Sequence, residues 1–369
     1  MWRRIWALII KEFLAIWNDQ RSRAVIIVPP LIQLMVFGYA ATFDVNHVAT
    51  AIYDEDSGAA AANLVARFSS SPTFHILYHL DAQSQIAQKI DSRTVGLVIH
   101  IGPTFTRDLL SGRPTTIQAI VDGRESNTAL IILGYVNQVV ESFDQSWSLQ
   151  TRQPLPPAQL VTRYWFNPNL QSRWFIIPGI VALLSMVVTI VVTALTIARE
   201  REVGTFEQLL VTPFSPLEIL IGKSVPALAI GMGEGSFIIL AAVLWFHVPL
   251  RGSIGLLYAG LLLYILAVIG IGLMVSSLAR TQQQAMLGAF LFVVPAVILS
   301  GFATPIANMP SFIQTITLAN PMRYFLVVVR GLFLEDLPVR VVLAQLWPMA
   351  IIGALTLGGA SWLFRHRAT

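Results

Sequence analysis

The chain has 369 residues and a formal net charge of +4, and 55% of its residues are hydrophobic while 12% are charged. The charged share is about half of what soluble proteins carry, so a soluble fold of this length would struggle to hide its apolar residues. The low charge argues against nucleic-acid binding. The absence of cysteine excludes disulfides and thiolate metal sites.

The first 43 residues predict a helix on the membrane followed by a helix through it. In residues 1–23, tryptophans and isoleucines recur at helical spacing between basic and acidic residues, which is typical of an amphipathic helix in the cytoplasmic interface. Residues 24–43 contain no charge and are long enough to cross a bilayer core. Pro29 and Pro30 are expected to kink this first transmembrane helix near its start.

Residues 44–173 differ in character from the rest of the chain. Four short apolar runs are typical of strands and alternate with helical segments, which predicts a small α/β domain placed outside the cytoplasm. The predicted strands are residues 48–54, 73–79, 94–101 and 115–122. The predicted helices are residues 57–70, 82–91, 103–111 and about 126–149.

The remainder, residues 174–369, predicts a transmembrane domain with five further spans. These spans lie near 174–198, 225–246, 254–279, 285–303 and 341–364. Together with residues 24–43 they predict a mainly α membrane protein with six transmembrane helices and an inserted α/β domain. The apolar stretch at 324–334 is too short to span and carries Arg330 in its middle. We therefore expect segment 304–340 to hold a re-entrant or interfacial helical pair on the outer side.

The distribution of Lys and Arg near span ends predicts the orientation. With the N-terminus in the cytoplasm, the inner segments hold Arg3, Arg4, Lys11, Arg21, Arg23, Arg199, Arg201, Lys223, Arg280, Arg365 and Arg367. The short outer loops then hold Arg251, Arg323, Arg330 and Arg340. This asymmetry places both termini and the loop 199–223 in the cytoplasm.

No pattern indicates catalysis, and no cofactor or metal site is expected in this chain. Gly222-Lys223-Ser224 resembles the end of a phosphate loop, but position 217 is Leu where that motif needs glycine, and no strand precedes it. Lys223 is better interpreted as a marker of the cytoplasmic end of a span. His75 and His79 lie on a predicted strand and are more simply explained as solvated or partly packed than as metal ligands.

Glu234 is the one acidic residue inside a predicted span, between Gly231 and Gly235. A carboxylate in the bilayer is costly and usually faces a partner, water or a transport pathway. Contact with a substrate or ion and a structural role near a helix interface, protonated or paired with an arginine, both remain open.

The loop from Arg199 to Pro213 is the most informative segment. It starts with charged residues, and Phe206, Leu209 and Leu210 share one helical face before Pro213 stops the helix. A short amphipathic helix held between two spans suits docking into a groove on a soluble partner. The alternative is an ordinary interfacial helix.

This loop resembles the cytoplasmic signature of type-2 ABC transporter permeases. Three other segments resemble the same family: Asn167-Pro168 through Gly179, Asn320 to Phe325 with Arg330-Gly331, and Val121-Asp122-Gly123 with Ser126 to Ala129. The last of these is similar to the bacterial subgroup with a large domain after the first span. The resemblance covers essentially the whole chain. Glu234 has no counterpart in this family pattern.

The resemblance implies the permease subunit of an ATP-driven exporter in a bacterial inner membrane, moving a drug-like, amphipathic or lipid-linked substrate. ATP and Mg would bind to a partner ATP-binding subunit, and the permease would pair with itself or with a paralogue. A periplasmic adaptor protein is a further partner that this subgroup suggests. The resemblance implies coupling to the ATPase through Glu202, Gly204, Thr205, Phe206, Glu207, Leu209, Leu210 and Pro213. It implies an outer re-entrant region around Asn320, Pro321, Arg323 and Arg330.

Two other classes of protein stay open. One is a membrane-anchored sensor with an outer ligand-binding domain, although six spans exceed what an anchor needs. The other is an ion-coupled carrier that uses Glu234, although such carriers typically show inverted repeats. Dependence of transport on ATP or on a proton gradient would distinguish the exporter from the carrier.

Overall fold

The computed structural model describes residues 2–39, 47–124, 126–151, 171–205 and 214–367. The chain divides into two compact units, which are described separately. One contains Met1–Thr42 and Tyr164–Thr369, and the other contains Phe43–Arg163.

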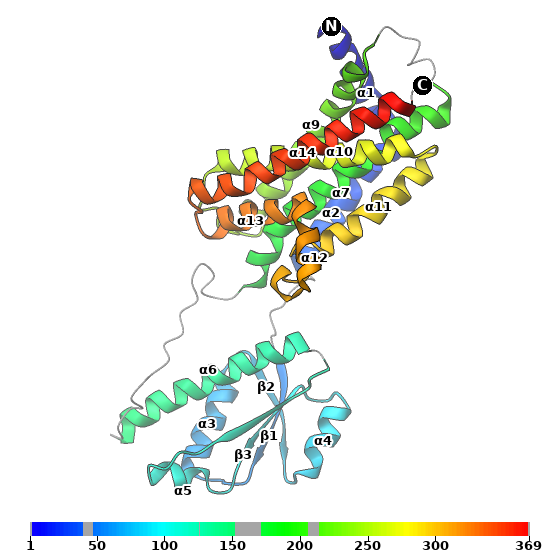
Figure 1. Ribbon diagram of the computed structural model, residues 1–369. Coiled ribbons are helices and arrows are strands. Elements are labelled where there is room, and N and C mark those ends of the chain that lie inside the picture. The colour runs from blue at the N-terminus through cyan, green and yellow to red at the C-terminus, as the bar shows by residue number, and fades with distance from the viewer. Residues whose placement is uncertain (1, 40–46, 125, 152–170, 206–213, 368–369) are drawn as a thin grey trace. The chain divides into compact units, whose positions relative to one another are not determined.

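The first unit is built from helices alone in the part that the structure describes (Figure 1). Its α-helices are α1 (Trp2–Asn18), α2 (Gln20–Tyr39), α7 (Ser172–Val203), α9 (Pro216–Leu244), α10 (Ile254–Leu278), α11 (Gln282–Ile298), α12 (Ser311–Ile316), α13 (Pro321–Leu334) and α14 (Val339–Arg367). Two 3-10 helices, η1 (Ile306–Asn308) and η2 (Thr317–Ala319), flank α12.

Among the described residues, four helices are long and apolar enough to cross a membrane: Ser172–Val203, Leu217–Leu244, Ile254–Leu278 and Val339–His366. The other two predicted spans, 24–43 and 285–303, coincide with α2 and α11. Their apolar stretches, Ile26–Tyr39 and Gln282–Ile298, are shorter. A bilayer core needs about 20 residues, so six spans remain a prediction.

Helix α7 forms the centre of the helical unit. It is apolar on all sides and most of its residues are buried, as expected for a helix surrounded by others. It contacts α2, α9, α10, α11 and α13. Glycines allow this close packing: a methyl group added to Gly235 of α9 would lie 2.7 Å from Leu261 of α10 and 3.2 Å from Ser185 of α7.

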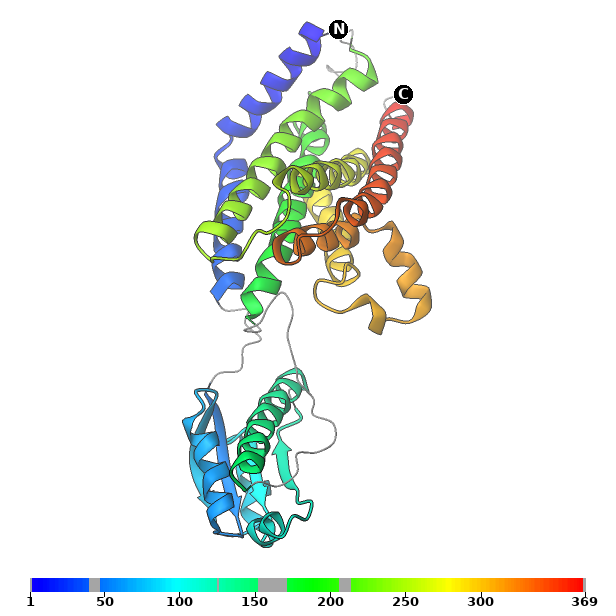
Figure 2. The same cartoon turned by 90° about the vertical axis from the view of Figure 1, so that its left-hand side faces the viewer.

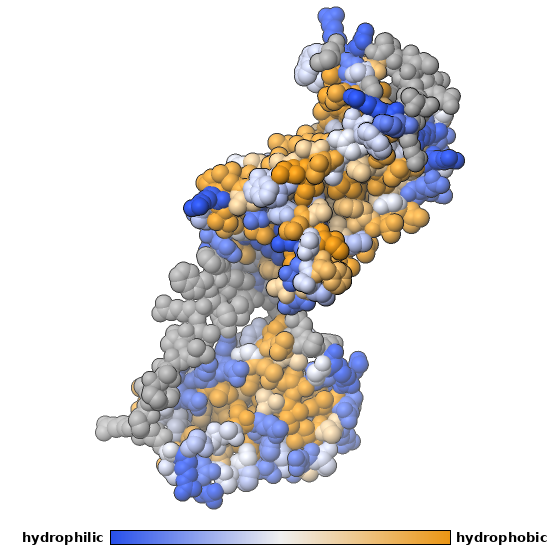
Figure 3. Space-filling view, in the orientation of Figure 1, coloured by the Kyte–Doolittle hydropathy of each residue, from blue (hydrophilic) through white to orange (hydrophobic). Residues whose placement is uncertain are grey.

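The outer faces of the surrounding helices are apolar. Exposed hydrophobic side chains follow α11 and α14, including Leu287, Leu291, Trp347 and Leu355. Figure 3 shows hydrophobic residues over most of the visible face of this unit, between its two more polar ends. Apolar patches of this extent are typical of a membrane contact.

The predicted helical pair in segment 304–340 is present. Ser311–Ala319 and Pro321–Leu334 meet at an angle of 84°. Asn320 stands at the bend, where its side chain accepts a hydrogen bond from Met322 N at 3.1 Å and donates one to Ala296 O at 2.6 Å. Pro321 then occupies the first turn of α13, where proline is well tolerated.

The second unit contains a four-stranded sheet in the order β2-β1-β3-β4. Its strands are β1 (Val48–Asp54), β2 (Phe74–Leu80), β3 (Leu97–Ile101) and β4 (Ile117–Val121). β1 pairs in parallel with β2 and β3, with Ile52 opposite Ile99, and β4 pairs antiparallel with β3. All four predicted strands are therefore present.

Helices cover both faces of this sheet. They are α3 (Ala59–Ser70), α4 (Ser84–Asp91), α5 (Phe105–Leu110) and α6 (Ser126–Thr151). Ile52 and Ile99 share a core with Phe68 of α3 and Phe143 of α6 on one face. Ala51 and Val98 point to the other face and pack with Ile86 of α4. Successive side chains of a strand point to opposite faces of the sheet, so the helices on the two faces bury both sets.

Candidate functional site at the loop between α7 and α9

Helix α7 extends further toward the loop than predicted. We expected the span to end near residue 198, but the helix continues through Val203. Gly204 then ends it in the left-handed conformation, with φ of +79°, and Thr205 N donates to Glu200 O at 2.9 Å. Gly204 therefore ends α7.

The other end of the loop is also capped. The side chain of Ser215 accepts a hydrogen bond from Glu218 N at 3.3 Å, while Ser215 N donates to Glu218 Oε2 at 2.8 Å. This reciprocal capping box and Pro216 start α9 nine residues before the predicted span at 225. The coupling residues Phe206, Glu207, Leu209, Leu210 and Pro213 lie outside the described residues.

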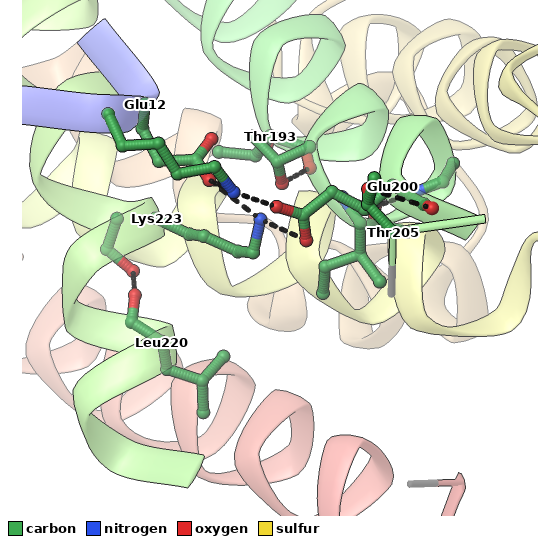
Figure 4. Close-up of polar contacts among 12 residues, drawn as sticks. Glu12, Thr193, Glu200, Thr205, Leu220 and Lys223 are labelled. Atoms are coloured by element: carbon green, nitrogen blue, oxygen red, sulfur yellow. Dashed lines mark hydrogen bonds and ion pairs between the residues drawn. The ribbon is translucent and has the colours of Figure 1, made fainter. Parts of the chain in front are cut away.

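Four charged side chains gather beside this loop, here called the charge cluster: Lys11, Glu12, Glu200 and Lys223 (Figure 4). Lys223 Nζ lies 3.0 Å from Glu12 Oε1 and 2.8 Å from Glu200 Oε2. Lys11 Nζ lies 2.6 Å from Glu200 Oε1 and 3.6 Å from Glu12 Oε1. Two cations and two anions leave the charge cluster neutral.

The charge cluster connects three helices. Lys11 and Glu12 belong to α1, Glu200 to α7 and Lys223 to α9, and Figure 2 shows α1 running beside α9. Gly222 permits this approach, since a methyl group there would lie 2.7 Å from Leu8 Cγ. The side chain of Lys223 is completely buried, with 0% exposure. Removing one partner of such a buried pair is strongly destabilising.

Lys223 lies within a helix and between carboxylates. Gly222, Lys223 and Ser224 lie inside α9, and the Ser224 hydroxyl donates to Leu220 O at 2.7 Å, so these residues form no phosphate loop. Its amine is buried between the carboxylates of Glu12 and Glu200, and its position at the cytoplasmic end of a span stays a prediction. The sequence holds one sign of the charge cluster. Glu12 falls on the same face of α1 as Leu8 and Ile5, where a buried acid needs a partner.

The end of α7 is also attached to the start of α11. Glu202 Oε2 accepts a hydrogen bond from Gln282 N at 2.7 Å, and Arg201 donates to Ser277 O at 2.8 Å and Ala279 O at 3.1 Å. These contacts and the charge cluster hold the Glu200–Thr205 end of α7 against α1, α9, α10 and α11. A displacement of the end of α7 would therefore move several helices together.

Glu234 is remote from the loop and lacks partners in the part of the chain that the structure describes. Both of its carboxylate oxygens are buried without a hydrogen bond. It lies on the side of α9 away from Ser236, which accepts a hydrogen bond from Tyr258 of α10 at 2.9 Å. The Ser185 and Thr189 hydroxyls of α7 are likewise buried without a partner in that part of the chain. Of the alternatives left open for Glu234, pairing with an arginine is not formed among the described residues.

The outer residues singled out in the sequence come together at the helical pair. Asn320 and Pro321 form the start of α13, as described above. Arg323 donates to Gln314 O at 3.3 Å and to the Thr317 hydroxyl, and so fixes the bend from within. Arg330 lies further along α13, over the ring of Phe175.

Across the described ranges, no group of three or more His, Asp or Glu side chains is placed to hold a metal ion. His75 and His79 lie on β2 with exposed side chains.

The long apolar helices, the apolar outer faces and the bent helical pair define a polytopic membrane protein. The chain belongs to the ABC-2 family of transporters, since the profile of the ABC-2 family transporter protein matches residues 24–362. It is an ABC-2 permease, and permease subunits of ABC transporters are not themselves catalytic.

Relatives of the same length support this assignment. The chain is 37% identical to the probable multidrug ABC transporter permease YbhR of Escherichia coli K12, over 100% of both chains. It is 36% identical to the probable multidrug ABC transporter permease YbhS of the same organism, over 99% of this chain and 97% of the relative. It is 29% identical to the inner membrane transport permease YhhJ, over 100% of this chain and 98% of the relative.

Proposed function

We propose that this chain is the transmembrane subunit of an ATP-driven exporter that moves a drug-like, amphipathic or lipid-linked substrate out of the cytoplasm or the inner leaflet. Membership of the ABC-2 family and the printed names of its multidrug relatives support this proposal. ATP and Mg bind to the partner ATP-binding subunit, which carries out the hydrolysis.

The proposal rests on the way in which the end of α7 and the start of α9, on either side of the loop, are held together. Glu200 precedes the loop and Lys223 follows it, and their charged groups lie 2.8 Å apart in a buried setting. Capping at Gly204 and at Ser215 fixes where each helix ends. A displacement of the loop therefore moves the ends of α7 and α9 together, and α1 with them.

The loop itself provides the surface for the ATPase. From their spacing in the sequence, we expect Phe206, Leu209 and Leu210 to share one face of a helical turn and to insert into a groove on the ATPase. Glu202 and Glu207 pair with basic residues around that groove, which favours correct docking more than raw affinity. Closure of the ATPase on ATP then pushes the loop and tilts the spans, so that a path opens outward.

The orientation and the assembly follow from the same proposal. Both termini and the loop 199–223 lie in the cytoplasm of a bacterial inner membrane, and domain 44–173 lies outside. The permease pairs with itself or with a paralogue. A periplasmic adaptor protein contacts the outer domain in those assemblies that use one.

An ion-coupled carrier is the second candidate, because Glu234 is a buried carboxylate without a partner among the described residues. Transport by the chain reconstituted in vesicles with its co-purified ATPase separates the two functions. The exporter requires ATP and continues when the proton gradient is collapsed. Transport that follows the proton gradient and ignores ATP would replace the exporter with the carrier.

A further inference from the structure

Arg330 of α13 is partly buried, and its guanidinium lies against aromatic rings. Its guanidinium carbon lies 3.7 Å from the centre of the Phe175 ring on α7 and 5.7 Å from the centre of the Phe302 ring. The absence of a side chain at Gly179 makes room for it, since a methyl group there would lie 3.2 Å from Arg330 Nη2. The aromatic faces attract the cation but cannot replace a counter-ion.

The guanidinium lacks the partners that its charge needs. Among the described residues, Nε and Nη2 have no hydrogen-bond partner, and no carboxylate forms an ion pair with Arg330. Its one hydrogen bond runs from Nη1 to Gly301 O and is long, at 3.5 Å. A buried cation left unpaired is strongly unfavourable, so an anion from outside this chain would stabilise it.

Arg330 and Gly301, which accepts its one hydrogen bond, line a cavity of about 450 Å³. It is lined by three charged residues, Arg323, Arg330 and Glu335, and by apolar side chains that include Ile306, Leu326 and Val327. Glu335 forms no ion pair with either arginine within the described ranges. Two cations and one carboxylate leave the cavity positively charged and open to a single anionic group.

The position of the cavity favours a lipid over a soluble anion. Val327 is 43% exposed on the apolar surface of the helical unit, so the cavity adjoins that surface. Gly179, which lies beside Arg330, and Glu200, which belongs to the charge cluster, are both on α7. At 1.5 Å per residue, they are separated along the helix by roughly 30 Å. That length matches the thickness of a bilayer core, so Arg330 lies at headgroup depth on the side opposite to the charge cluster.

We propose that this cavity binds the phosphate of an anionic phospholipid, with Arg330 as its main ligand. Turning the guanidinium away from Gly179 presents Nη1 and Nη2 to the phosphate as two parallel donors, the geometry in which arginine binds phosphate best. The acyl chains lie along Val327 on the apolar surface. This site is independent of the loop that contacts the ATPase.

The test is lipid binding by the purified full chain in detergent, followed by native mass spectrometry and thermal unfolding. Phosphatidylglycerol, phosphatidylcholine and inorganic phosphate are titrated against the wild type, Arg330→Gln and Arg340→Gln. Arg340 is exposed and does not line the cavity, so Arg340→Gln is the matched control. If Arg330→Gln fails to fold, two other variants replace it in the binding test. Arg330→Lys keeps the charge, and Val327→Trp fills the cavity.

We expect the wild type and Arg340→Gln to retain phosphatidylglycerol over phosphatidylcholine. Arg330→Gln should weaken that binding by about tenfold or more, the effect of about one charged hydrogen bond. Val327→Trp should weaken it as well, and Arg330→Lys should keep part of it. Equal phosphatidylglycerol binding by Arg330→Gln and wild type would overturn the proposal. An equal stabilisation by inorganic phosphate alone would overturn the lipid as the ligand.

Discussion

Lys223 of α9 and Glu200 of α7 stand on the two sides of the loop that separates these helices, and their charged atoms lie 2.8 Å apart. Glu12 of α1 completes the contact at 3.0 Å from the same amine. Helix α1 and the two helices that flank the loop are therefore joined at one buried point. The contribution of the charge cluster to the stability of the permease and its role in transport can therefore be tested separately.

Replacement of Lys223 with Met should destabilise the permease, because Glu12 and Glu200 are then left buried with Lys11 as their one cation. We expect a loss of about 3–5 kcal/mol, the usual effect of removing one partner from a buried pair. Thermal unfolding of the purified chain measures it.

The double variant Lys223→Met with Glu200→Gln keeps Lys11 and Glu12 as a neutral pair and should recover at least about 1 kcal/mol of that loss. Arg340→Met, at an exposed site, is the control. Additive losses in the double variant would show that Lys223 and Glu200 do not interact.

Replacement of Glu234 with Gln should leave assembly intact but alter transport. The carboxylate is buried without a partner among the described residues, so its role is not the stabilisation of a particular contact. Transport is measured over a range of pH, with thermal unfolding as the control for folding. Identical transport at each pH would assign Glu234 a structural role.

Cysteine labelling tests the orientation, since the chain has no native cysteine. Leu110 of the outer domain is 61% exposed and Val203 at the end of α7 is 66% exposed, so a cysteine at either position is accessible. An impermeant maleimide should label Leu110→Cys in intact cells and Val203→Cys only after lysis. The reverse pattern would invert the proposed topology.

Most of the secondary structure follows from local sequence. Short apolar runs locate the four strands, and the central strands β1 and β3 are buried on both faces, as is typical of parallel strands covered by helices. The apolar blocks locate α7, α9, α10 and α14, because only membrane helices are apolar over that length. The predicted helix ends were less accurate. α7 continues past Arg199 because Glu200 and Arg201 find partners on other helices, so their charges do not end the helix.

The charge cluster could not be derived in the same way. Lys223 and Glu12 are 211 positions apart, and no local pattern links them. The sequence did indicate the importance of the loop residues Glu202, Gly204 and Thr205, which the structure places at the end of α7. Phe206, Glu207, Leu209, Leu210 and Pro213 remain predictions, because they lie outside the described residues.

Substrate-stimulated ATP hydrolysis by the reconstituted complex tests the central claim most directly. The variants are Glu207→Lys and the double change Leu209→Asp with Leu210→Asp, which place charges on the face that we expect to enter the ATPase. Leu110→Asp in the outer domain is the matched control. Both loop variants should fold, insert and lose ATPase capture and stimulated hydrolysis, while the control keeps both. Wild-type capture and hydrolysis in the loop variants would contradict the assignment of this loop as the coupling element.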